Sequence, residues 1–143
     1  MTDRLFSVEE ANGMLPYVQR VAQDIVDGYA RWQRLVGEFE VESARRLEGD
    51  DATEARRLER EALRVAADID GCQRELARLG VEFKGYEQGL LDFPAERDGR
   101  PVYLCWQLGE AQVAHWHDRD AGYAGRRPLA ASDIAGVPLS ETA

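Results

Sequence analysis

The chain has 143 residues, of which 44% are hydrophobic and 31% charged, so it can form a buried core and is not disordered throughout. No run approaches the roughly 18 apolar residues of a membrane span, and the N-terminus lacks the apolar segment of a signal peptide. A net charge of −9 disfavours a broad nucleic-acid surface, because the phosphate backbone would repel such a chain. The two cysteines indicate no disulfide framework, and we expect a cytoplasmic protein.

The first predicted element is a short helix over 7–15. Ser7 is placed to cap its first free backbone N–H groups, and Glu10 stands where a capping-box carboxylate would. Asn12 and Gly13 interrupt the helical pattern, and Pro16 suits the first position of a new helix. We therefore expect a break before the long helix that follows.

Two long helices are predicted over 16–46 and 52–79. In each of them the apolar residues alternate in spacing between four and three positions, which is the heptad pattern of a coiled coil. The apolar stripe of the first helix consists of Val18, Ala22, Ile25, Tyr29, Trp32, Val36 and Phe39. The stripe of the second consists of Leu58, Ala62, Val65, Ile69, Cys72, Leu76 and Leu79.

The two stripes match when one helix is folded back on the other about a turn near Gly49. Trp32 then faces Val65 and Ile25 faces Cys72, in pairs whose numbers add to 97. The sequence therefore predicts an antiparallel helical hairpin with arms about 40 Å long.

Some apolar residues lie off these stripes and would remain partly wet in a monomer. They are Val21, Val26, Leu35 and Leu63. We therefore expect a homodimer, or a subunit of a larger protein complex, formed through the hairpin. The highly charged tip, 45–61, is interpreted as a solvated helix surface, with docking of a partner as the alternative.

After Gly80 the apolar pattern changes to the alternation of β-strands. This pattern predicts a small antiparallel β-meander of three or four strands over 81–118. Asp98 and Gly99 mark a tight turn between two of these strands. One face of the meander is expected to pack on the base of the hairpin.

The last part of the chain changes to glycine, proline and short polar residues. We expect a loop over 119–129 that is rich in glycine and arginine, and a loosely ordered tail over 130–143. The fold class is then α+β, with a single domain over 1–129.

The densest polar cluster surrounds His115 and His117 at the end of the meander. Two histidines two positions apart on a strand share one face, roughly 6.5 Å apart, so both can reach one divalent metal. A third ligand would come from elsewhere in the chain. The candidates are Asp92, Cys105, Glu110 and Asp118. The alternatives are histidines that only form hydrogen bonds or face water, and a histidine general base oriented by Asp92 or Glu110.

A second cluster, 121–128, combines two glycines with Arg126 and Arg127. Such a loop can hold a carboxylate or phosphate through backbone N–H groups and a bidentate guanidinium. The alternative is that the glycines supply positive φ angles and Arg126 pairs with a carboxylate of the chain. Cys105 is interpreted as a buried, inert thiol, with a reactive thiol as the alternative.

Several stretches together carry a family resemblance. They are Phe6–Pro16, Leu91–Ala95 with Arg97, Gly99 and Arg100, Val102–Glu110, Trp116-His117 and Ala121–Leu129. They resemble the prokaryotic family known as domain of unknown function 2203, over nearly the whole chain apart from a variable helical middle. The resemblance implies a helical hairpin followed by a small β region and brings no established activity.

The resemblance also draws attention to particular polar and aromatic side chains. They are Asp92, Arg97, Cys105, Trp106, Glu110, His117 and Arg126. The family pattern has the Trp116-His117 pair without a histidine two residues earlier, which makes His117 a better ligand candidate than His115. Arg97 joins Arg126 as a candidate anion-binding residue.

Two classes of function remain open from the sequence. We favour a small interaction or assembly module acting through the hairpin, because long heptad hairpins serve association and no catalytic constellation is complete. The alternative is a small metal-binding protein or enzyme with a site on the meander. That site would contain Asp92, Glu110, His117 and Arg126. A buried pocket that brings these four together would favour the second class.

Overall fold

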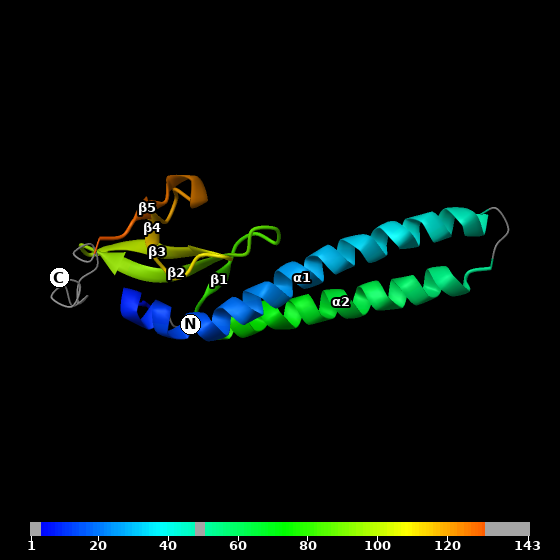
Figure 1. Ribbon diagram of the computed structural model, residues 1–143, viewed down its shortest axis with the longest axis horizontal. Helices are drawn as coiled ribbons and strands as arrows, with labels where there is room; N and C mark the ends of the chain where they lie inside the picture. Colours follow the sequence, from blue (N-terminus) through cyan, green and yellow to red (C-terminus); the bar gives the residue numbers. More distant parts are fainter. Residues whose placement is uncertain (1–3, 48–50, 131–143) are drawn as a thin grey trace.

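Two helices precede a five-stranded sheet, as Figure 1 shows. The structure is a computed structural model that describes residues 4–47 and 51–130. Its helices are α1 (Val8–Leu47) and α2 (Thr53–Arg78), and its 3-10 turn is η1 (Tyr123–Gly125). Its strands are β1 (Glu82–Phe83), β2 (Leu90–Arg97), β3 (Arg100–Gln107), β4 (His115–Asp118) and β5 (Arg127–Pro128). A helical hairpin followed by an antiparallel β-meander is the α+β fold that the sequence predicts.

The start of α1 carries the predicted capping box. The backbone N–H of Ser7 donates to the Glu10 carboxylate at 2.9 Å, and the backbone N–H of Glu10 donates to the Ser7 hydroxyl at 3.0 Å. These reciprocal bonds satisfy two backbone groups that the helix itself leaves without partners.

The predicted break between a short and a long helix is wrong, because α1 is continuous from Val8 to Leu47. The Asn12 side chain accepts the N–H of Val113 at 2.7 Å and donates to its carbonyl at 3.3 Å, which anchors the helix to the sheet. Pro16 removes one helical hydrogen bond, and the dark blue beginning of α1 is bent relative to the remainder (Figure 1). Tertiary packing thus overrides the local breaking signals and leaves a bend.

The two helices run antiparallel and pack on each other (Figure 1). A close approach between them fits the predicted register. A Cβ atom built on Gly28 would lie 3.1 Å from Cγ1 of Ile69, and these two numbers add to 97 as the register requires. Most of the second stripe is buried, whereas the first stripe is buried up to Ile25 and half-buried beyond it. The buried members are Val18, Ala22, Ile25, Leu58, Ala62, Val65, Ile69 and Leu76. The turn predicted near Gly49 lies outside the described residues, as does the predicted tail beyond residue 130.

The strands form one antiparallel sheet in the order β1-β2-β3-β4-β5. Asp98 and Gly99, which join β2 to β3, both have positive φ angles of 54° and 76°, as the predicted tight turn requires. The segment predicted as a loop over 119–129 instead contains η1 and β5. Arg127 of β5 pairs with Trp116, and the N–H of Leu129 donates to the Ala114 carbonyl at 2.8 Å. These contacts cover the edge that β4 would otherwise leave open.

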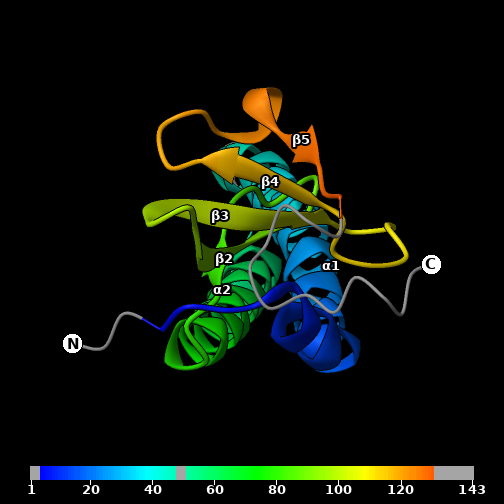
Figure 2. The same cartoon turned by 90° about the vertical axis from the view of Figure 1, so that its left-hand side faces the viewer.

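One face of the sheet packs against the first half of α1, and the strands lie beside the hairpin in the end-on view of Figure 2. The side chains on this inner face include Leu91, Phe93, Val102, Leu104, Trp106 and Trp116. Because side chains alternate along a strand, the residues between them project from the outer face. The outer face carries the candidate site.

The sheet covers part of the apolar surface that we predicted to stay wet in a monomer. Val21 is 7% exposed, and Val26 is half-buried against Gly89 and its neighbours, whereas Leu63 is 64% exposed. The homodimer or complex stays a prediction. Part of the apolar surface from which we predicted it is covered by the sheet of the same chain. Neither of the two helices that the structure describes combines the length and the apolar character needed to cross a membrane.

Candidate metal centre

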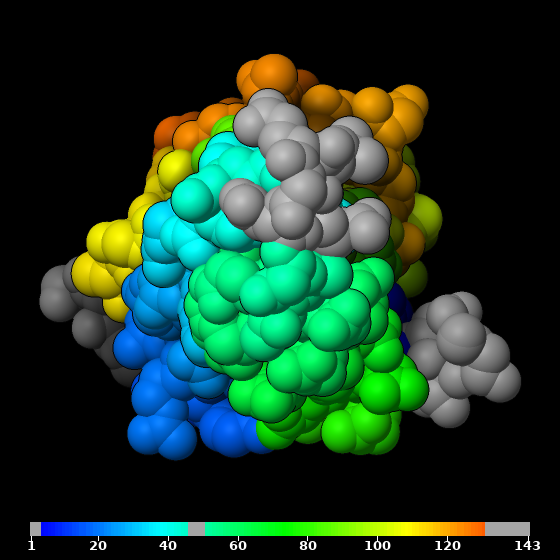
Figure 3. Space-filling model, turned by 90° about the vertical axis from the view of Figure 1, so that its right-hand side faces the viewer, coloured from blue at the N-terminus to red at the C-terminus, as the bar shows by residue number. Residues whose placement is uncertain are grey.

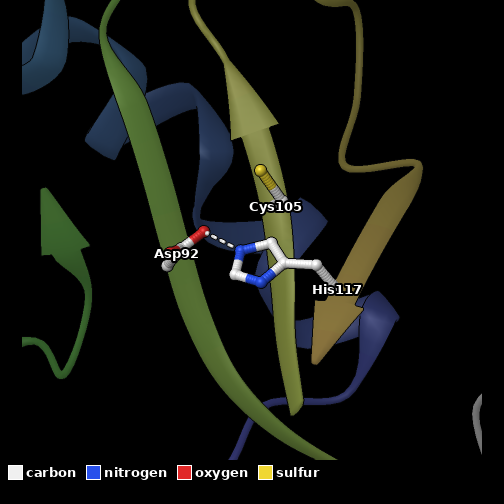
Figure 4. A group of neighbouring side chains, drawn as sticks. All are labelled: Asp92, Cys105 and His117. Atoms are coloured by element: carbon white, nitrogen blue, oxygen red, sulfur yellow. Dashed lines mark hydrogen bonds and ion pairs between the residues drawn. The ribbon is translucent and has the colours of Figure 1, made fainter. Parts of the chain in front are cut away.

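Three neighbouring strands bring Asp92, Cys105 and His117 together on the outer face of the sheet (Figure 4). Asp92 of β2 pairs directly with Cys105 of β3, and His117 of β4 pairs with Tyr103, two residues before Cys105. In an antiparallel register, paired residues and their neighbours two positions away share one face. The register therefore places all three side chains on the same face within reach of one another.

This group of polar residues is buried. Asp92 is 5% exposed, Cys105 1% and His117 2%. Each residue offers one ligand atom, and the three atoms lie within 4.8 Å of one another. Buried ionisable groups are costly unless they are paired or bind an ion, so their convergence calls for a chemical explanation.

His117 is held in one orientation by two hydrogen bonds. Its Nδ1 lies 2.7 Å from the backbone carbonyl oxygen of Asp118, and its Nε2 lies 3.1 Å from Oδ1 of Asp92. A carbonyl oxygen only accepts, so this network assigns the proton to Nδ1. The bond between Nε2 and Oδ1 then needs a second proton, carried by one of these two atoms. A metal ion that displaces this proton would face the Nε2 lone pair and a carboxylate oxygen.

Burial dominates the electrostatics of the two acidic members. It raises the pKa of Asp92 above its usual value, although His117 and Lys84 act in the opposite direction. Burial, together with the charge of Asp92, raises the pKa of the Cys105 thiol to about 12. Both groups are thus shifted towards their neutral forms, and a bound cation would reverse that balance.

A second polar cluster lies at the end of β3 that contains Gln107. Nη2 of Arg126 donates to both carboxylate oxygens of Glu110 at 2.9 Å, and the N–H of Gln107 donates to Oε1 at 2.8 Å. Nδ1 of His115 lies 3.8 Å from Oε2 of the same carboxylate. Burial alone would raise the pKa of Glu110, but the hydrogen bonds from Arg126 and Gln107 outweigh it and lower that pKa. The cluster ties the segment after β4 to β3.

The four metal-ligand candidates from the sequence thus separate into two pairs. His117 meets Asp92, and Cys105, which the sequence offered among the third ligands, completes that group. His115 instead lies beside Glu110, whose main partner is Arg126.

The other candidates have different surroundings. The Asp118 carboxylate pairs with Arg100 at 3.0 Å. The guanidinium carbon of Arg97 lies 4.4 Å from the centroid of the Trp116 ring, near the end of β2 opposite to the Glu110–Arg126 pair. The structure therefore does not bring Arg97 and Arg126 into one anion site.

Several residues that the sequence did not identify as site candidates lie beside the group. A cavity of about 120 Å³ adjoins the three ligand candidates and is bordered by Lys84, Tyr103, Arg119 and Tyr123. The available signal was the alternation of 81–84, which places Glu82 and Lys84 on one face of a strand. That signal does not identify the residues across from them, because register is set by tertiary pairing.

Comparison with known proteins gives a family and no activity. The family model described as "Uncharacterized conserved protein (DUF2203)" matches residues 4–129, and the chain belongs to this family. Neither the comparison with curated proteins nor that with solved structures finds a match.

Proposed function

We propose that this member of a family without an assigned activity is a metal-binding protein that holds one Zn²⁺-type ion through Asp92, Cys105 and His117. The observation that carries the proposal is the convergence of a carboxylate, a thiol and an imidazole, all buried, with ligand atoms within 4.8 Å of one another. These are the three ligand types that Zn²⁺ takes in proteins.

The distances suit a shared ion. Two oxygen or nitrogen ligands bound to tetrahedral Zn²⁺ lie roughly 3.3 Å apart, and Nε2 of His117 is 3.1 Å from Oδ1 of Asp92. The Cys105 sulfur lies within 4.8 Å of a ligand atom of each of the other two residues, so the three groups can meet around one ion after a small movement of their side chains. The bond from Nδ1 of His117 to a backbone carbonyl is the outer contact that orients many metal-binding histidines.

Three protein ligands leave one position of a tetrahedral ion open. Structural zinc sites commonly use four protein ligands, whereas catalytic sites keep a position for water or substrate. All three ligands border the 120 Å³ cavity, which gives an incoming molecule a place beside the ion. The arrangement supports a metal that binds or activates a small molecule.

Cobalt(II) titration tests this proposal directly. Cobalt(II) replaces zinc in such sites, and a thiolate ligand gives an intense charge-transfer absorption. We expect one equivalent to bind to the native chain, and D92N, C105S and H117Q each to lose that absorption. H115Q is the matched control, because it removes the histidine on the same strand that lies outside the group, and it should bind like the native chain. A native chain without cobalt(II) absorption would contradict the proposal.

A second candidate function is protein association through the hairpin. The observation in its favour is that the hairpin extends far beyond the sheet, so that the end of α1 and the beginning of α2 lie away from the strands (Figure 1). Figure 3 shows the molecule from the tip, with the ends of α1 and α2 in front of the strands. Val41 and Leu63 on these helices are 59% and 64% exposed.

Light scattering at tens of micromolar tests the association. We expect the mass of a dimer for the native chain and of a monomer for a double variant with Val41→Glu and Leu63→Glu. A monomeric native chain that recovers no partner from cell extract would contradict this second function.

A further inference from the structure

The cavity beside the three proposed ligands limits what the open metal position can bind. Its volume is about 120 Å³, whereas pockets for drug-sized ligands reach several hundred. The cavity itself therefore holds a group of only a few non-hydrogen atoms.

The charge around the cavity favours an anion. A divalent ion bound by one thiolate, one carboxylate and a neutral imidazole is electrically neutral. Lys84 and Arg119 then add two positive charges at the cavity wall, and Glu82, whose Oε1 lies 3.4 Å from Nζ of Lys84, removes one. The site is left with a local positive charge in a chain whose net charge is −9.

Lys84 is the only lysine of the chain and is held at the edge of this cavity. Its Nζ lies 4.0 Å from Oδ2 of Asp92 and 5.2 Å from the centroid of the Tyr103 ring. The Tyr103 hydroxyl donates to Glu82 at 2.9 Å, which fixes the ring beneath the ammonium group. The ammonium group is thus positioned beside a proposed metal ligand.

Arg119 supplies the second cation. Its guanidinium carbon lies 4.3 Å from the centroid of the same Tyr103 ring, and its Nε donates to the Val102 carbonyl at 3.1 Å. With Nε occupied, the two terminal nitrogens remain as donors. Guanidinium groups bind carboxylate and phosphate through such paired donors.

Tyr123 of η1 also borders the cavity. Its hydroxyl donates to Oε1 of Gln107 at 2.8 Å, which ties the turn to β3. The ring therefore contributes wall area while its polar group is used elsewhere, and this limits the size of a bound molecule.

We infer that the open metal position binds a small oxyanion, a carboxylate or phosphate group, held by Lys84 and Arg119. This inference rests on the proposed metal site. It names the class of molecule that the site would take: a small acid whose oxygen replaces water on the ion while the two cations neutralise its charge.

The test uses the protein loaded with one equivalent of cobalt(II) and freed of excess metal. Sodium acetate and inorganic phosphate are each titrated against the visible absorption of the bound cobalt(II). We expect saturable spectral changes, with dissociation constants raised about tenfold or more in K84M and in R119Q. R74Q is the matched control, because Arg74 pairs with Asp70 on α2, and it should bind the anions like the native chain. Circular dichroism checks that each variant is folded.

The outcomes separate this inference from the metal site itself. A response to acetate alone assigns a carboxylate, a response to phosphate alone assigns a phosphate group, and both responses support the shared oxyanion chemistry. If cobalt(II) binds but neither anion changes its spectrum, or if K84M and R119Q respond like the native chain, the inference is wrong while the metal site stands. If cobalt(II) does not bind, the proposed function itself has failed.

Discussion

Nε2 of His117 lies 3.1 Å from Oδ1 of Asp92, although 25 residues separate them in the chain. The two side chains meet because β3 stands between β2 and β4 and sets the register of both. The pair is buried, and the Cys105 thiol is the third member of the group. Binding of a metal to this group, or replacement of one of its side chains, should therefore change the stability of the sheet.

Zn²⁺ should raise the thermal stability of the native chain. An ion present at 100 times its dissociation constant adds about 2.7 kcal/mol to the free energy of unfolding. For a chain of this size, that gain raises the unfolding midpoint by roughly 10 °C. Differential scanning fluorimetry with and without Zn²⁺ measures the shift, and EDTA should reverse it.

The histidine variants separate specific from surface binding of Zn²⁺. H117Q should lose the shift, because it removes a buried ligand, and H115Q should keep it. Equal shifts in both variants would show that the ion binds elsewhere on this acidic chain.

The Cys105 thiol of the metal-free chain should be inert. The side chain is 1% exposed, and with a pKa of about 12 its thiolate fraction at pH 8 is about 10⁻⁴. We expect C72S, which leaves only Cys105, to react with a disulfide reagent far more slowly than C105S, which leaves the half-buried Cys72. Denaturant should abolish the difference. Equally rapid reaction of both folded variants would contradict the burial of Cys105.

The fold was predictable where local pattern and packing agree. The heptad stripes predict both helices and their register, and the contact between Gly28 and Ile69 fits that register. The break predicted at Asn12 and Pro16 is wrong. The two hydrogen bonds between Asn12 and Val113, which support a continuous helix, join residues 101 positions apart. Local sequence patterns do not predict contacts between residues so far apart in the chain.

The site was predictable only in part. His117 and Asp92 stood out as residue types that bind metals, and Cys105 was one of several possible third ligands. Which of them meet depends on strand register, and a shift of one residue would move Asp92 to the inner face. The register also pairs His115 with Cys105, but its Nδ1 lies 3.8 Å from Oε2 of Glu110, so the direction of the ring, rather than the register, keeps His115 out of the group.

Two glycines on α1 provide a matched test of the hairpin register. Replacing glycine by alanine inside a helix adds about 1 kcal/mol of stability when the new Cβ meets nothing. Gly37 has no atom within 4 Å of that position, so G37A should gain this amount, whereas a Cβ on Gly28 would lie 3.1 Å from Ile69. We therefore expect G28A to gain less than G37A or to lose stability in urea unfolding. Equal stabilisation would mean that Ile69 does not pack there.

Glu110 should make the stability of the chain depend on pH. Burial raises the pKa of this carboxyl, but the hydrogen bonds from Arg126 and from the N–H of Gln107 outweigh it, and the net pKa lies below the usual 4.5. A group whose pKa is lower in the folded state stabilises that state above its unfolded pKa, and this contribution disappears as the pH falls through the folded pKa. The carboxylate therefore stabilises the fold at neutral pH and ceases to do so in acid.

E110Q should cost roughly 1–2 kcal/mol of unfolding free energy at pH 7, because it removes a hydrogen-bonded charge facing Arg126. The difference from the native chain should shrink as the pH falls below 4.5, where the unfolded carboxyl takes up its proton first. Urea unfolding from pH 7 to pH 3 measures both quantities. E87Q serves as the control, because Glu87 is exposed and its replacement should change stability by less than about 0.5 kcal/mol. A difference between E110Q and the native chain that stays constant down to pH 3 would show that the charge of Glu110 does not stabilise the fold.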